Sequence, residues 1–224
     1  MKIYAIIVAA GKGTRMNSEL PKQFMILSGK PLYTYCMQHF IDAFSEIEII
    51  FVIPPNSNIL HKEVQSFFDK KIHLNIVHGG DTRFQSVKNG LNFIKENGVV
   101  FIHDAARPFI DKEFLHYLLE ETILYQNAIP YTDLNDSIRL INEQENIAVD
   151  RTKYKVIQTP QVFKTEIILD AYKQVEKNIF TDDASVVEAD GEDIHLAKGL
   201  TQNIKITRPI DFQLAELSLK QENN

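Results

Sequence analysis

The 224-residue sequence contains a single cysteine, Cys36, so no disulfide can form within the chain. Disulfides belong mainly to oxidising compartments, and their absence here favours a reducing, cytoplasmic location. Cys36 lies in the apolar-rich stretch 31–44. A free cysteine in such surroundings usually packs as a small hydrophobe, so we expect a packing role rather than a catalytic one.

Long apolar runs and an excess of basic residues are also missing. No stretch approaches the roughly 20 apolar residues that cross a bilayer, and the N-terminus has neither the apolar region nor the cleavage site of a secretory signal. The formal net charge of −6 argues against non-specific nucleic-acid binding but is compatible with a local basic pocket. Repeats and low-complexity tracts are absent, and only residues 220–224 look frayed, which predicts one domain over residues 1–224.

Short apolar runs alternate with amphipathic stretches along most of the chain. Runs rich in Ile and Val lie at residues 3–9, 47–53, 74–77 and 99–102. Their length and continuity are typical of parallel strands that are buried on both faces. Helical periodicity appears at 114–124, with Asp111 as the expected N-cap, and at 83–96, which we expect to end near Gly98. This alternation predicts an α/β fold with a Rossmann-like, doubly wound, mostly parallel sheet.

The segment at about 133–154 interrupts this rhythm. Two short alternating runs, 137–141 and 147–151, flank a polar tip at 142–146, which predicts a β-hairpin with a longer loop. The apolar residues of this arm would be poorly buried if it only projected into solvent. We therefore expect the arm to pack against a second subunit, and the alternative is a surface excursion of the same domain.

A glycine-containing loop follows the first expected strand and reads A-A-G-K-G-T-R-M, with P-K-Q shortly after it. The carboxyl edge of such a sheet is where open α/β folds bind ligands, and glycines let backbone N–H groups approach an anion. The loop is not a P-loop, because Gly13 follows Lys12 where Ser or Thr would be required. It also lacks the third glycine of a dinucleotide fingerprint, which argues against a dehydrogenase. Arg15 and Lys22 beside the loop instead suit a triphosphate.

Three further polar segments follow expected strands in the same way. They are G-G-D-T-R at 79–83, H-D-A-A-R-P at 103–108 and N-I-K-I-T-R-P at 203–209. Each charged residue alone would be read as solvated surface, but loops that return to one sheet edge would bring several cations together in an acidic protein. The expected set is Arg15, Lys22, Arg83, Arg107 and Lys205. His103 beside a single aspartate is a weak zinc signal, so we expect a structural role for it.

In order along the chain, the motifs are A-A-G-x-G-x-R-M, P-K-Q, G-G-D-x-R, H-D-A-A-R-P, D-R, T-P-Q, T-D-D-A and N-I-K-x-T-R-P, from residue 9 to residue 209. This series resembles the 2-C-methyl-D-erythritol 4-phosphate cytidylyltransferases of the non-mevalonate isoprenoid pathway. The resemblance implies one nucleotidyltransferase domain that moves CMP from CTP to the polyol phosphate and releases diphosphate, with Mg²⁺. Ribitol 5-phosphate cytidylyltransferases share most of these positions and are the first alternative. A non-catalytic nucleotide-binding module is the second.

The resemblance also implies roles for individual residues. Arg15 and Lys22 match residues that stabilise the transition state, and Arg151 and Lys205 match residues that orient the attacking phosphate. The residues matching the CTP pocket are Ala9, Ala10, Gly11, Gly13, Asp81, Ser86, Asp104 and Ala105, and Asp104 also matches a carboxylate at the metal site. Those matching contacts to the polyol phosphate are Arg107, Ser137, Thr159 and Thr181. Because Ser137 and Arg151 lie on the arm, which reaches the partner's site in that family, a homodimer is implied.

Overall fold

The computed structural model describes residues 1–11, 20–68, 71–142 and 144–222, with side chains up to residue 220. Two of the expected site residues, Gly13 and Arg15, lie outside this part of the chain. Among the described residues, the longest helices have 14 residues, and none is apolar and long enough to span a bilayer.

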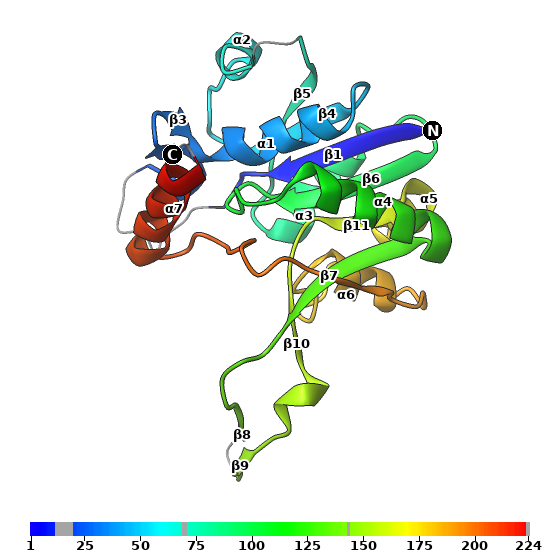
Figure 1. Cartoon of the computed structure of the whole chain (residues 1–224). Coiled ribbons are helices and arrows are strands. Elements are labelled where there is room, and N and C mark those ends of the chain that lie inside the picture. Colours follow the sequence, from blue (N-terminus) through cyan, green and yellow to red (C-terminus); the bar gives the residue numbers. More distant parts are fainter. Residues whose placement is uncertain (12–19, 69–70, 143, 223–224) are drawn as a thin grey trace.

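A central sheet in the order β10-β7-β11-β6-β1-β4-β5, with β12 beside β7, runs through the molecule (Figure 1). Its parallel core comprises β1 (Lys2–Val8), β4 (Glu48–Ile53), β5 (His73–His78) and β6 (Gly98–Asp104). The other strands are β7 (Asn127–Asp133), β10 (Lys155–Ile157), β11 (Gln161–Lys164) and β12 (Leu196–Lys198). Only β10 and β11 run antiparallel to their neighbours, which confirms the prediction of a mostly parallel sheet.

Helices cover both faces of the sheet. Successive side chains of each buried strand point to opposite sides, so both faces carry apolar side chains that need a covering layer. Ala5 and Ile7 of β1 belong to the apolar cluster that includes α1 (Leu32–Ala43), α2 (His61–Gln65) and α4 (Lys112–Tyr125). Tyr4 and Ile6 belong to the opposite cluster, built with α3 (Arg83–Leu91), α5 (Thr165–Ala171) and α6 (Asp183–Glu188). The doubly wound fold expected from the alternation is therefore present.

Cys36 lies on α1 and is completely buried. Burial raises the pKa of its thiol to about 12, so the thiol stays protonated at neutral pH. The packing role expected for this residue is confirmed.

The helix expected over 83–96 is shorter than its apolar periodicity suggested. The helix α3 ends at Leu91, and Gly98 is not a helix terminator but the first residue of β6. A Cβ atom at Gly98 would lie 2.1 Å from the carbonyl oxygen of Lys2 on the neighbouring strand. The glycine is therefore required because the two strands approach closely at this point. In the sequence alone, a glycine in this position looks the same as one that ends a helix. The expected cap of α4 is confirmed, because the Asp111 carboxylate accepts from Phe114 N–H at 2.7 Å.

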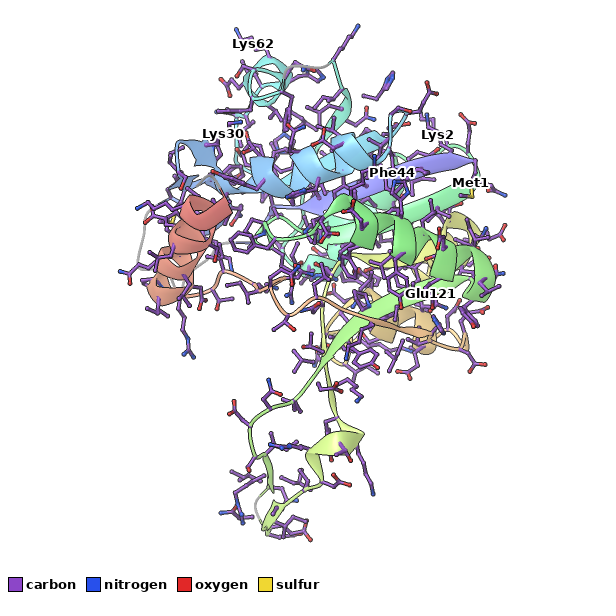
Figure 2. The ribbon with its side chains drawn as sticks, viewed as in Figure 1. Met1, Lys2, Lys30, Phe44, Lys62 and Glu121 are labelled. Carbon is purple, nitrogen blue, oxygen red and sulfur yellow. The ribbon has the colours of Figure 1, made fainter. Side chains whose placement is uncertain are left out.

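The predicted arm is present and projects away from the body of the molecule (Figure 1). Its tip is the antiparallel pair β8 (Arg139–Ile141) and β9 (Asn146–Ala148). The expected second strand is shorter than 147–151, because Arg151 begins the 3₁₀ helix η3 (Arg151–Lys153). Side chains along the arm point into open space (Figure 2), and Ile141 is 71% exposed.

Charged side chains hold the root of the arm. Asp133, the last residue of β7, accepts from the Nζ of Lys155 on β10 at 2.5 Å and of Lys198 on β12 at 3.3 Å. Both ammonium groups also lie over the ring of Tyr131, 5.0 and 5.6 Å from its centroid. Three strands are therefore tied together at the point where the arm leaves the sheet.

A small group of elements packs beside the carboxyl edge of the sheet. It comprises η2 (Lys22–Phe24), β2 (Ile26–Leu27), β3 (Lys30–Pro31) and the C-terminal helix α7 (Pro209–Glu222). Leu27, Ala215 and Ile206 share one apolar cluster, so the segment that carries Lys205 is packed beside the segment that carries Lys22.

Candidate active site

A cavity of about 690 Å³ opens at the carboxyl ends of the parallel strands. This edge is where the sequence predicted ligand binding, because loops from different strands converge there. Eight of the predicted residues line the cavity: Ala10, Gly11, Lys22, Asp81, Arg83, Ser86, Asp104 and Lys205.

The described start of the glycine loop is held in place by Gln23. Its amide Nε2 donates to the carbonyl oxygens of Ala9 and of Gly11, at 2.7 Å in the second case. Gln23 is 3% exposed, so these two loop carbonyls are hydrogen-bonded to a buried side chain and not to solvent. Sequence reasoning missed this role, although P-K-Q was part of the recognised series.

We expect Gln23→Ala to raise about tenfold the KM for CTP, the nucleotide that the motif resemblance implies, because two loop carbonyls near the cavity lose their donor and the loop loses its fixed position. Steady-state kinetics with varied CTP would measure this change. Gln38→Ala is the matched control, since within the described part of the chain Gln38 donates to Asp42 alone, on the surface of α1. A KM for CTP that is the same in both variants would contradict this role of Gln23.

The loop after β5 approaches the glycine loop closely. A Cβ atom at Gly79 would lie 2.5 Å from Cβ of Ala10 and 2.7 Å from Oγ of Ser86, so only glycine fits. Ser86 accepts from Gly80 N–H at 3.1 Å and donates to the carbonyl of Thr82 at 2.8 Å. These contacts place Ser86 in the cavity wall and give the loop at 79–83 a fixed shape.

Asp104, at the end of β6, is surrounded by cations. Lys205 Nζ lies 2.7 Å from Oδ2, while the Nε atoms of Arg83 and Arg107 lie 3.6 Å from Oδ1 and 3.9 Å from Oδ2. Burial alone would raise the pKa of Asp104, but Lys205 and Arg83 outweigh burial and hold it well below its usual range. Asp104 is therefore ionised at neutral pH. With Asp183, which pairs with Arg83, three cations face two carboxylates, and the net positive charge leaves this wall attractive to phosphate groups.

A buried polar chain supports the backbone of Asp104. Asp104 N–H donates to the hydroxyl of Thr159 at 3.0 Å, and that hydroxyl lies 3.2 Å from Nδ1 of His103. Nε2 of His103 lies 2.9 Å from the carbonyl oxygen of Arg107, which can only accept, so Nε2 carries the proton. His103 thus acts in packing and hydrogen bonding, and the hydroxyl of Thr159 faces this chain and not the cavity.

Burial lowers the pKa of His103 from 6.5 to about 4. Because the folded-state pKa is the lower one, the unfolded chain binds the proton first, and the stability due to neutral His103 is lost as pH falls from 6.5 toward 4. We expect this residue to reduce the free energy of unfolding by about 2 kcal/mol at pH 5 relative to pH 7.5. Urea unfolding at both pH values would measure it. His103→Gln should lose this part of the pH dependence, whereas His61→Gln, which changes an exposed histidine, should keep it.

Arg107 lies behind the cavity wall and is nearly buried. Its Nη1 donates to the carbonyl of Asn203 at 2.7 Å, and its Nε has no hydrogen-bond partner among the described residues. Burial lowers the pKa of Arg107, while Asp104 opposes that shift. Its unsatisfied N–H leaves a donor available beside Asp104.

The remaining predicted residues lie away from the cavity lining. Ala9 and Ala105 are buried beneath it, and Thr181 is exposed just before α6, with its N–H donating to Ser185 Oγ at 3.1 Å. Ser137 and Arg151 are exposed on the arm, where the Arg151 guanidinium donates to the carbonyl of Asn135. A single chain therefore does not bring the arm residues to its own cavity.

The donor set was tested against Mg²⁺. No group of three His, Cys, Asp or Glu side chains that could hold a metal is found among the described residues. Asp104 is the one predicted metal ligand, and both its oxygens face cations. Mg²⁺ is often held by one or two carboxylates together with water and substrate phosphates. The site therefore fits Mg²⁺ that arrives with a triphosphate, not a metal held by the protein alone.

Comparison with known proteins agrees with this geometry. The sequence profile of the 2-C-methyl-D-erythritol 4-phosphate cytidylyltransferases matches residues 3–221. Proteins of that name from Bacteroides fragilis and Bacteroides thetaiotaomicron are 43% and 40% identical, over 96% and 98% of this chain and 98% and 100% of theirs.

Solved structures give the same result. The 4-diphosphocytidyl-2C-methyl-D-erythritol synthase of Anaerococcus prevotii superposes with a TM-score of 0.83 at 26% identity, covering 98% of both chains. The cytidylyltransferase of Thermus thermophilus gives 0.79 at 28% identity, covering 98% of this chain and 100% of the other. The chain belongs to the 2-C-methyl-D-erythritol 4-phosphate cytidylyltransferase family.

Proposed function

We propose that this protein transfers CMP from CTP to 2-C-methyl-D-erythritol 4-phosphate and releases diphosphate. One observation carries the proposal: a cavity at the carboxyl edge of the sheet is lined by Lys22, Asp104 and Lys205, at the positions that the family motifs assign to the reaction. The identities of the nucleotide and the acceptor in this proposal come from family membership.

The reaction forms a bond between an oxygen of the acceptor phosphate and the α-phosphorus of CTP, and it breaks the bond between that phosphorus and the β-phosphate oxygen. The attacking group and the substrate are both anions, so positioning and charge neutralisation dominate the barrier. In our assignment Lys22 neutralises charge on the leaving diphosphate, a role that the family motifs also give to Arg15, which lies outside the described residues. Lys205, which also lines the cavity, orients the acceptor phosphate.

Mg²⁺ belongs to this proposal. It would be held by Asp104 and the triphosphate oxygens, and it supplies neutralisation of the charge that develops on the leaving diphosphate. Lys205, which now pairs with Asp104 at 2.7 Å, would leave that oxygen and turn to the acceptor phosphate.

The proposed assembly is a homodimer in which each arm completes the partner's site. Ser137 and Arg151 lie on the arm and are exposed, and the apolar residues Leu140, Ile141 and Ile147 at its tip are exposed as well. An arm with such a surface is better explained by a partner than by solvent. We also propose a cytoplasmic location, which the single buried thiol of Cys36 supports.

Purified protein incubated with labelled CTP, Mg²⁺ and one polyol phosphate at a time would test the acceptor. We expect turnover with 2-C-methyl-D-erythritol 4-phosphate and release of one diphosphate per product. Exclusive turnover of ribitol 5-phosphate would overturn this acceptor, although each relative reported above is named for methylerythritol. Binding of CTP without turnover of either acceptor would favour a non-catalytic nucleotide-binding module.

A further inference from the structure

Arg83 links two carboxylates that come from separate parts of the chain. Its Nη1 and Nη2 atoms donate to Asp183 at 2.9 and 2.6 Å, and its Nε lies 3.6 Å from Oδ1 of Asp104. We propose that Asp183, the first residue of α6, is a positioning residue for the reaction. Acting through Arg83, it fixes the carboxylate of Asp104 at the cavity wall.

The Asp183 side of the pair is enclosed, whereas the Arg83 side chain is 28% exposed at the cavity. Asp183 is completely buried, and it accepts a third hydrogen bond from the hydroxyl of Tyr172 at 2.6 Å. The ring of Tyr172 stacks on Phe84, with centroids 4.6 Å apart and planes 15° apart, and the ring of Phe180 also stacks on Phe84. The guanidinium therefore has one orientation, set from the side away from the cavity.

Stability alone does not explain this arrangement. A buried ion pair loses solvation that its own attraction only partly returns, and well-packed apolar residues are often at least as stabilising. A pair with only a structural role would also need no second carboxylate beside the guanidinium. Here Nε of Arg83 lies 3.6 Å from Oδ1 of Asp104, a residue that lines the cavity.

The proposal rests on the proposed function, which gives Lys205 to the acceptor phosphate. Lys205 is the cation closest to Asp104, at 2.7 Å, while Nε of Arg107 is 3.9 Å away. When Lys205 turns to the phosphate, Asp104 loses that contact. Arg83 then remains beside Asp104. Because Arg83 is held by Asp183, it keeps the carboxylate of Asp104 in place during the reaction.

Asp183→Asn tests this directly, because it keeps the shape and removes the charge. We expect kcat to fall roughly 10–100-fold, as for other outer residues that orient a site, with the KM for CTP changed less than about threefold. Asp170→Asn is the matched control, since Asp170 on α5 makes only an exposed ion pair with Lys173, just beyond the helix, among the described residues. A folded Asp183→Asn protein with the kcat of the control would overturn the proposal.

Arg83→Lys provides a second test if Asp183→Asn folds poorly. Lysine keeps the positive charge, but one ammonium cannot hold both carboxylates as the guanidinium fork does. The proposal expects a loss of kcat at least as large as in Asp183→Asn, with a far-UV circular dichroism spectrum like the wild type. Wild-type kcat in Arg83→Lys would show that charge alone suffices and would overturn it.

The wild-type protein is assayed first with CTP and each polyol phosphate. No turnover in the wild type would overturn the proposed function and this inference with it. Turnover in the wild type that is undiminished in Asp183→Asn and Arg83→Lys would overturn this inference alone.

Discussion

Lys22→Ala is expected to lower kcat by roughly 10²–10³ while the protein stays folded, as for removal of a fixed donor at a developing negative charge. Lys22 lines the cavity and donates to the carbonyl of Ile206 at 2.5 Å, which holds its stem on the protein. The ammonium is thus placed at the cavity wall before substrate arrives, and such preorganised charge accelerates the step in which charge builds up on the leaving diphosphate.

Single-turnover kinetics with saturating CTP would measure this loss in the chemical step. Lys30→Ala is a suitable control, because Lys30 is an exposed lysine on β3, a few residues away. Thermal unfolding of both variants would show whether the fold is retained. Turnover of Lys22→Ala within about threefold of the control would argue strongly against the proposed role of Lys22 in catalysis and in favour of a nucleotide-binding module.

The second large effect concerns the arm. If each arm serves the partner's cavity, Arg151→Ala damages the neighbour's site and Lys22→Ala damages the subunit's own site. We expect each variant alone to be nearly inactive. A one-to-one mixture, unfolded and refolded together, should recover about a quarter of wild-type activity, since half of the dimers are mixed and each mixed dimer has one intact site.

A mixture of Lys22→Ala with Lys205→Ala is the matched control, because both residues line the cavity of one chain. No recovery is expected there. Recovery in neither mixture, with Arg151→Ala inactive, would mean that the arm serves its own chain. Light scattering on the intact protein and on a variant lacking residues 137–151 would show whether the arm is required for the dimer, and a monomeric intact protein would contradict the proposed assembly.

Much of the fold could be predicted because its determinants are local. The Ile- and Val-rich runs became β1, β4, β5 and β6, since strands buried on both faces need continuous apolar residues. The end of α3 could not be placed in this way. Gly98 is required by the carbonyl of Lys2, which lies on the neighbouring strand and far away in sequence.

For the site, too, local features could be predicted from the sequence and contacts between distant segments could not. Asp81 follows β5 and Asp104 ends β6, and the rule that loops meet at the carboxyl edge brought these two together in advance. Lys205 lies in an irregular segment between β12 and α7. Gln23 and Asp183 were not assigned a role, because each acts through a contact with another segment. Asp183 meets Arg83 across 100 residues of sequence, and nothing in the T-D-D-A motif indicates that partner.

The cluster at the root of the arm has a consequence for experiments at different ionic strengths. Asp133, Lys155 and Lys198 hold the arm to the sheet through exposed charges, which salt screens, whereas the sheet itself is held by buried apolar packing, which salt does not weaken. At about 1 M salt the Debye length falls to about 3 Å, so these exposed ion pairs weaken while the backbone pairing of β10 with β7 and the buried packing remain. Assays at low and high salt therefore differ in the charge contribution at the root of the arm and not in the fold of the body.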